Sequence, residues 1–291
     1  MSDVGDFKSE DSRDRYFEAY DKAMNDCPAP DAVHDIETRH GTTRVYGFGF
    51  GDAPPIVLLP GLLATSACYG PLLPVLAAHR PVYAIDTLGE AGRSVHTAPF
   101  DGIPDRARWL DEVLESLGLT GVHLAGGSTG GWHAVNQAIN APGRIASISL
   151  LDATTVTAPF ARTMLWYGMP AVVLNKDWLW RRFLRWSAGA DIMDRPDARL
   201  VLAGIREYKP RIPFQVRPSD DDLRSIKVPV LAFFGARSVV HDSKAAADRL
   251  RALLPHADVE VLPDAGHYIY LRDADRARIV DRILEFAKKG S

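Results

Sequence analysis

The chain has 291 residues, of which 46% are hydrophobic and 24% are charged, and these proportions exclude a disordered, collagen-like or coiled-coil chain. Its 34 Lys and Arg residues nearly balance 37 Asp and Glu residues, which gives a formal net charge of -3. This balance lacks the basic surface that a nucleic-acid-binding protein needs to neutralise phosphates.

The first quarter of the chain predicts a short helix followed by extended segments. Residues 16–24 form the expected helix, and Pro28 and Pro30 interrupt the chain after it. Residues 43–50 are expected to be extended, with a turn at 51–54. The unbroken apolar run at 56–59 is typical of a parallel strand that is covered on both faces.

Beyond this strand, apolar strands and amphipathic helices alternate. The expected strands cover residues 81–85, 122–125, 145–151, 229–234 and 259–262, and the expected helices cover 104–117, 130–140, 244–254 and 274–287. Such alternation predicts an α/β fold with a mainly parallel central sheet flanked by helices.

The segment 154–226 does not alternate and holds four of the six tryptophans, Trp166, Trp178, Trp180 and Trp186. We interpret it as an inserted helical cap over a core formed by residues 1–153 and 227–291. Within it, the stretch 177–186 is a basic, aromatic, amphipathic helix that buries its aromatic side chains and turns its arginines to water. Contact with a substrate carboxylate or a membrane surface is the alternative for this helix.

The motif that points to chemistry is Gly126-Gly127-Ser128-Thr129-Gly130, between an expected strand and an expected helix. A serine on such a tight turn is lifted clear of the backbone, and the glycines two positions on either side remove Cβ atoms that would clash. A glycine-rich turn that only packs closely or binds phosphate is the alternative. No phosphate-binding G-x-x-x-x-G-K sequence follows it, so we expect Ser128 to be a nucleophile.

A serine nucleophile needs a base within hydrogen-bond reach. His267 follows the last expected strand, so it lies at the same edge of a parallel sheet as Ser128. We therefore expect His267 to be the base. His123 lies within a strand, His133 lies in the helix after Ser128, and His241 is a weaker competitor.

Three sequence features together resemble the α/β-hydrolases, and most closely the bacterial serine carboxylesterases. They are Leu59-Pro60-Gly61-Leu62, the turn around Ser128, and Ala265-Gly266-His267. The resemblance covers nearly the whole chain. It implies that the backbone N–H groups of Leu62 and Thr129 form an oxyanion hole, where fixed dipoles stabilise the charge that develops during acyl transfer.

The acid of the expected triad departs from the family pattern, because Ser238 occupies its usual place in Gly235-Ala236-Arg237-Ser238. We expect Asp152, at the end of an earlier strand, to replace it. Asp242 is the second candidate, although it also fits a helix N-cap. In the third alternative, no acid exists and activity is weak or lost.

The resemblance implies hydrolysis of a carboxylic ester through an acyl-enzyme, without cofactor or metal. The aromatic cap favours an apolar or aromatic small molecule, and we expect Trp166 and Trp132 to contact it. Lactone or thioester cleavage, acyl transfer or cyclisation would use the same site, and a ligand-binding pseudoenzyme is the alternative from another class. An active-site serine probe separates the enzymes from the pseudoenzyme.

Location and partners follow from the same sequence. The two cysteines, Cys27 and Cys68, are too few for a disulfide framework, the N-terminal residues lack a secretory signal, and no apolar run approaches the ~18 residues that span a bilayer. We therefore expect a cytoplasmic enzyme, monomeric or homodimeric, that binds a small-molecule ester and neither nucleic acid nor membrane.

Overall fold

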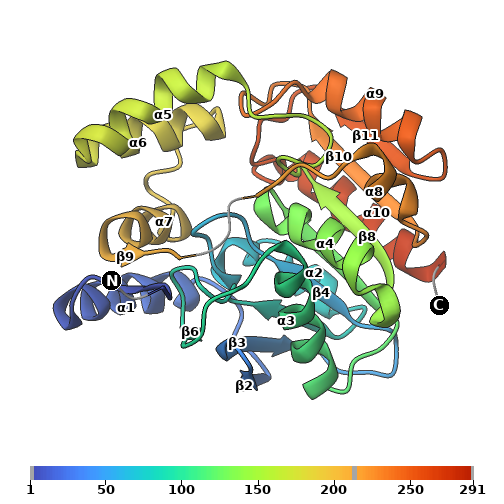
Figure 1. Cartoon of the computed structure of the whole chain (residues 1–291), viewed down its shortest axis with the longest axis horizontal. Helices are drawn as coiled ribbons and strands as arrows, with labels where there is room; N and C mark the ends of the chain where they lie inside the picture. The colour runs from blue at the N-terminus through green and yellow to red at the C-terminus, as the bar shows by residue number, and fades with distance from the viewer. Residues whose placement is uncertain (1–2, 212–214, 290–291) are drawn as a thin grey trace.

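The computed structural model describes residues 3–211 and 215–289, and it is organised around one central sheet (Figure 1). The strands follow the order β11-β10-β8-β7-β4-β5-β3-β2, and β6 pairs with β3. Pairing is parallel from β11 to β5 and antiparallel where β3 meets β5, β6 and β2. The expected mainly parallel α/β sheet is confirmed. Its strands are β2 (Ala32–Thr38), β3 (Gly41–Phe48), β4 (Ile56–Leu59), β5 (Val82–Ile85), β6 (Val95–His96), β7 (Val122–Gly127), β8 (Ile145–Leu151), β10 (Val230–Gly235) and β11 (Asp258–Leu262).

Apolar clusters cover both faces of this sheet. In β4, Val57 and Leu59 belong to one cluster, whereas Ile56 and Leu58 belong to the other. Successive residues of a strand point to opposite faces, so a strand that is buried on both sides must be apolar throughout. This is why the uninterrupted apolar runs located the central strands.

Helices from different parts of the chain supply the two covering layers. The first cluster includes side chains of α3 (Ile103–Ser116), α4 (Thr129–Asn140), α8 (Asp220–Ser225) and α9 (Ser243–Leu253). The second includes side chains of α1 (Glu10–Asn25), α2 (Leu73–Ala77), α7 (Pro196–Glu207) and α10 (Asp273–Lys289).

The segment between β8 and β10 contains three helices that extend beyond the sheet, α5 (Arg162–Leu174), α6 (Asp177–Ala188) and α7 (Figure 1). A small apolar cluster that includes Leu184 and Leu202 joins α6 to α7. The last helix of this segment, α8, contacts α4 and α9 instead. These contacts favour a cap narrower than 154–226, made of α5 to α7, and the division into core and cap stays a prediction.

The N-terminal segment packs against the end of the cap, at α7 and the strand that follows it. Helix α1 packs along α7, and the short strands β1 (Asp6–Phe7) and β9 (Tyr208–Lys209) pair antiparallel. Lys8 N–H also donates to the Glu207 carbonyl at 2.9 Å. Two segments that are distant in the sequence thus form one unit.

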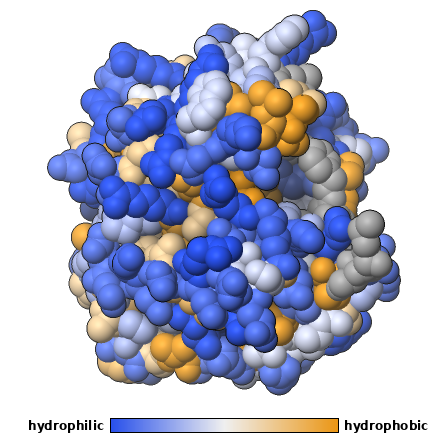
Figure 2. Space-filling view, turned by 90° about the vertical axis from the view of Figure 1, so that its left-hand side faces the viewer, coloured by the Kyte–Doolittle hydropathy of each residue, from blue (hydrophilic) through white to orange (hydrophobic). Residues whose placement is uncertain are grey.

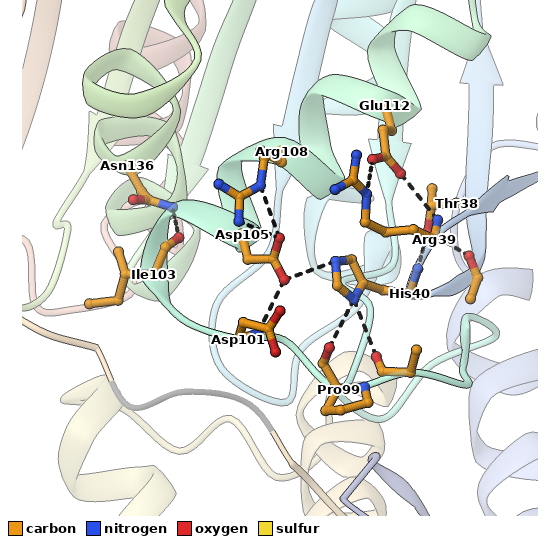
Figure 3. Close-up of polar contacts among 12 residues, drawn as sticks. Thr38, Arg39, His40, Pro99, Asp101, Ile103, Asp105, Arg108, Glu112 and Asn136 are labelled. Carbon is orange, nitrogen blue, oxygen red and sulfur yellow. Dashed lines mark hydrogen bonds and ion pairs between the residues drawn. The ribbon is translucent and has the colours of Figure 1, made fainter.

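A buried polar cluster ties the β2–β3 turn to the start of α3 (Figure 3). The His40 ring lies between the Asp105 carboxylate, 3.0 Å from its Nε2, and the carbonyls of Ala98 and Pro99, at 3.3 and 3.0 Å from its Nδ1. Asp105 also accepts from Asp101 N–H at 3.1 Å. Both ring nitrogens of His40 thus face oxygen atoms of the surrounding chain.

We predict that Asp105→Asn lowers the free energy of unfolding by about 2 kcal/mol at pH 7, because it removes the negative charge that accepts from Asp101 N–H and faces the buried His40 ring. Burial raises the pKa of Asp105, but hydrogen bonds from Asp101 and Arg108 and the charge of His40 outweigh it and lower the pKa. The contribution is therefore present above the unfolded pKa of about 3.9 and is lost as pH falls through the folded pKa. Urea unfolding at pH 7 and at acidic pH measures this; an equal difference at both values contradicts it.

No helix of the described chain has the length and apolar character needed to cross a membrane.

Candidate active site

Ser128 stands on a sharp turn between β7 and α4, with φ +52° and ψ −118°. Two glycines permit this turn. A Cβ at Gly130 would lie 1.8 Å from the Leu59 carbonyl oxygen, and one at Gly126 would lie 2.2 Å from the Gly130 carbonyl carbon. Backbone segments therefore touch directly where the motif requires glycine, and the serine is held in a strained conformation at the carboxyl edge of the sheet.

A buried tyrosine supports the same turn. Tyr69 Oη donates to the Leu59 carbonyl at 2.6 Å and accepts from Gly127 N–H at 2.9 Å. Burial raises the pKa of Tyr69, so the hydroxyl stays protonated and able to donate. Sequence reasoning missed this residue, because nothing in the local pattern relates position 69 to position 127.

His267 enters the site from the loop between β11 and α10. Its Nδ1 lies 2.7 Å from Asp152 Oδ2, and its side chain is 11% exposed. Both His267 and Ser128 line the same cavity. Among the described residues no direct hydrogen bond joins Ser128 Oγ to the imidazole, and such bonds are often long before substrate binds.

Asp152 follows β8 directly, is fully buried and has φ +49°. Its Oδ1 accepts from Gly235 N–H at 2.9 Å, and its Oδ2 accepts from Ser238 Oγ at 2.8 Å as well as from His267. On the other side, the buried His241 Nε2 lies 3.3 Å from Oδ1. The carboxylate is thus surrounded by donors, as a buried charge must be.

These contacts fix the charge of Asp152. Burial raises its pKa, but the contacts with His241 and His267 outweigh burial, and the pKa lies far below the usual range for aspartate. These contacts therefore favour the ionised form of Asp152. An ionised carboxylate on Nδ1 holds the imidazole in the tautomer that leaves Nε2 free to accept a proton.

The two candidates for the acid of the triad, Asp152 and Asp242, make different contacts. Asp242 caps α9, where its Oδ1 accepts from Ala245 N–H at 2.9 Å. Ser238, at the position of the family's usual acid, donates to the Asp152 oxygen that binds His267. Asp152 is therefore the carboxylate that contacts the imidazole, and Ser238 supports it. Neither Ser238 nor His241 was predicted in this supporting role.

The expected oxyanion donors also border the cavity. Thr129 is the buried first residue of α4, whose N-terminal end carries a partial positive charge. Leu62 is 54% exposed and lies in the loop that follows β4. Ser128, Leu62 and Thr129 all line one cavity, and this placement is compatible with the oxyanion hole that the family resemblance implies.

The cavity has a volume of about 740 Å³ and is mainly apolar. Its lining combines the residues at the sheet edge with cap side chains, including Met164, Val172, Phe183, Leu184 and Val201. Val172 is also 59% exposed, so the cavity reaches solvent beside the end of α5. Figure 2 views the molecule from the side of the cap and shows apolar atoms exposed near the top of this face.

The two tryptophans expected to contact substrate lie elsewhere. Trp132 is buried within α4, where its Nε1 donates to the Val216 carbonyl at 2.9 Å. Trp166 projects from α5 and is 80% exposed. Neither belongs to the lining of the cavity. Their aromatic character indicated burial or binding, but only the fold determines which way each side chain points.

The described residues contain no group of three or more His, Cys, Asp or Glu side chains arranged to hold a metal ion. Cys27 and Cys68 are free thiols. Burial raises the pKa of the Cys68 thiol, so although it lines the cavity it is not an activated nucleophile.

Known proteins share this sequence pattern. A family model described as the alpha/beta hydrolase family matches residues 56–282. Carboxylesterase YbfK of Bacillus subtilis is 29% identical over 98% of both chains. The carboxylesterase nap of the same organism is 28% identical over 94% of this chain and 92% of its own.

Solved structures of carboxylesterases are also similar to this chain. The crystal structure of carboxylesterase CesB (YbfK) from Bacillus subtilis superposes with a TM-score of 0.86 at 29% identity, over 95% of this chain and 98% of that one. The naproxen esterase (carboxylesterase NP) from Bacillus subtilis superposes with a TM-score of 0.88 at 27% identity, over 96% and 99%.

We predict that Gly130→Ala lowers the free energy of unfolding by more than about 3 kcal/mol or prevents folding, because the added methyl group overlaps the Leu59 carbonyl. Gly143→Ala is the matched control, since a Cβ there meets nothing within 4 Å. Circular dichroism and urea unfolding of both variants measure the effect. Similar stabilities would show that the turn tolerates a side chain.

Proposed function

We propose, from the premise that this chain belongs to the alpha/beta hydrolase family, that it is a serine carboxylesterase acting on apolar or aromatic small-molecule esters. The observation that carries the proposal is the contact of His267 with the buried Asp152, beside the strained Ser128, in one apolar cavity. The similarity to carboxylesterases over nearly the whole chain supports the same activity.

The reaction divides into two steps. Ser128 Oγ attacks the ester carbonyl while His267 Nε2 takes its proton, and the protonated imidazole then delivers this proton to the leaving alcohol. Water attacks the acyl-enzyme in the second step, again with His267 as base, and releases the acid and the free serine. Asp152 orients the imidazole and stabilises its positive form.

The N–H groups of Leu62 and Thr129 would hold the oxyanion that forms in both steps. Fixed donors of this kind stabilise developing charge without reorganising, and they supply a large part of the rate enhancement of many enzymes. The placement of both residues at the cavity supports this assignment.

Cavity size and character support the substrate class. A volume of about 740 Å³ suits a drug-sized molecule, and its lining supplies apolar contact for most of a ligand's surface. We further propose that the enzyme acts in the cytoplasm, as a monomer or homodimer, without cofactor, metal, nucleic-acid or membrane partners. Two free cysteines are compatible with a reducing compartment.

The alternatives are a ligand-binding pseudoenzyme and other reactions at the same site. The pseudoenzyme hypothesis rested on the missing acid at Ser238, and the contact between Asp152 and His267 removes that motive. Lactone or thioester cleavage, acyl transfer and cyclisation would use the same residues, and no feature of the cavity favours them over ester hydrolysis.

We predict that a fluorophosphonate labels Ser128 with one equivalent per chain, because an activated serine attacks this electrophile. The protein should also hydrolyse p-nitrophenyl esters, with higher kcat/KM for apolar acyl chains than for acetate. Ser128→Ala should lose both labelling and turnover. Intact mass spectrometry and the absorbance of released p-nitrophenolate measure the two results. A folded wild-type protein that shows neither result contradicts the proposed function.

We predict that Asp152→Asn lowers kcat by about 10⁴-fold, because the amide no longer holds the productive tautomer. Ser238 Oγ and His267 Nδ1 bind the same Asp152 oxygen, so a carboxylate at position 238 can reach the imidazole. The double variant Asp152→Asn with Ser238→Asp should therefore recover at least about tenfold of the lost kcat. Full activity of Asp152→Asn alone would remove Asp152 from the triad.

A further inference from the structure

A buried carboxylate contacts the loop that holds the expected oxyanion donor Leu62. Glu90, in the loop between β5 and β6, is 1% exposed. Its Oε2 accepts a hydrogen bond from Leu63 N–H at 2.5 Å. Neither the proposed triad nor the proposed oxyanion donors include this residue, and sequence analysis did not single it out.

The hydrogen bond reaches the loop at the residue that follows Leu62. Leu63 has φ +56°, a left-handed conformation that costs about 1 kcal/mol or more for a residue other than glycine and persists only where its surroundings hold it. A bond from a carboxylate to the Leu63 N–H fixes the plane of the Leu62–Leu63 peptide. Leu62 itself is 54% exposed and receives little support from packing.

The same carboxylate is linked to the helix that carries Thr129. Arg106 Nη2 of α3 lies 3.8 Å from Glu90 Oε1, and both side chains are buried. The Arg106 guanidinium also contacts His133 Nε2 and lies 5.3 Å from the centre of the Trp132 ring. His133 and Trp132 belong to α4, the helix that begins directly after Ser128.

We propose that Glu90 is a positioning residue. By binding the Leu63 N–H it holds the turn in which the Gly61 carbonyl accepts from Ala64 N–H at 3.0 Å, and this turn orients the Gly61–Leu62 peptide so that the Leu62 N–H faces the developing oxyanion. Through Arg106 it also connects this loop to the start of α4, where Thr129 supplies the second donor. The inference rests on the proposed function, because it assigns Glu90 a part in the same reaction.

The Glu90 carboxyl group is suited to this positioning role. Burial raises the pKa of Glu90 to about 7, while the charge of Arg106 and the bond from Leu63 oppose the rise. When ionised, this carboxyl group accepts a strong hydrogen bond from Leu63 N–H, and when protonated it still has an oxygen that can accept.

Steady-state kinetics of Glu90→Ala and Glu90→Gln on a p-nitrophenyl ester test the proposal. We expect Glu90→Ala to lower kcat by about ten- to a hundredfold with KM within about twofold, because a misplaced oxyanion donor affects the transition state and not substrate binding. Glu90→Gln should recover a large part of the loss, since its amide oxygen can still accept from Leu63 N–H.

Asp105→Asn is the matched control, because it also removes a buried carboxylate that accepts a backbone N–H. Its donor is Asp101, which does not line the cavity, whereas the donor to Glu90 is Leu63, which does. A Glu90→Ala variant whose kcat equals that of Asp105→Asn overturns the proposal, and so does a loss confined to KM. Thermal unfolding of each variant shows that the compared proteins are folded.

If Glu90→Ala does not fold, amide hydrogen exchange of the wild-type protein tests the proposal instead. We expect the Leu63 amide to exchange at least about tenfold more slowly than the Leu62 amide, and equal rates overturn the proposal. The experiments distinguish the proposed esterase activity from the proposed role of Glu90. Absence of wild-type hydrolysis and serine labelling refutes the esterase itself, whereas an active wild type with an equally active Glu90→Ala refutes only the role of Glu90.

Discussion

The candidate site depends on one buried negative charge. Asp152 has no exposed surface, and it is stable as an anion only because backbone and side-chain donors from the chain after β10 and from the loop of His267 converge on it. A carboxylate buried without such partners would take up a proton instead. The charge therefore ties the end of β8, the segment after β10 and the loop after β11 into one arrangement.

Close packing of backbone supplies the second constraint. Gly130 and Gly235 stand where a Cβ would overlap the Leu59 and Gly266 carbonyl oxygens, at 1.8 and 2.3 Å. Two pairs of segments at the carboxyl edge of the sheet, after β4 and β7 and after β10 and β11, thus approach each other more closely than a side chain would allow. Because parallel strands end at the same edge, residues far apart in sequence meet there without any contact being specified locally.

Local patterns in the sequence revealed the parts of the fold that depend on them. The central strands are apolar on both faces, and the turn at Ser128 has its own motif, so the amino-acid sequence was enough to locate both. Strand β2 was missed because its side chains alternate between half-buried and exposed and include His34, Asp35 and Glu37. The contacts of Tyr69, Ser238 and Glu90 could not be predicted in this way, since the partner of each is brought near only by the tertiary fold.

The pairing of β1 with β9 and the packing of α1 on α7 bear on how ligands enter. The N-terminal segment holds α7 in place, and α7 lines one side of the cavity. Helices α5 and α6 pack on each other, and Val172 of α5 is exposed, so we expect any widening of the entrance to involve these two helices rather than α7. Deleting the N-terminal segment would remove the strand pairing and the helix packing that hold α7, so we expect this segment to limit how far the entrance opens.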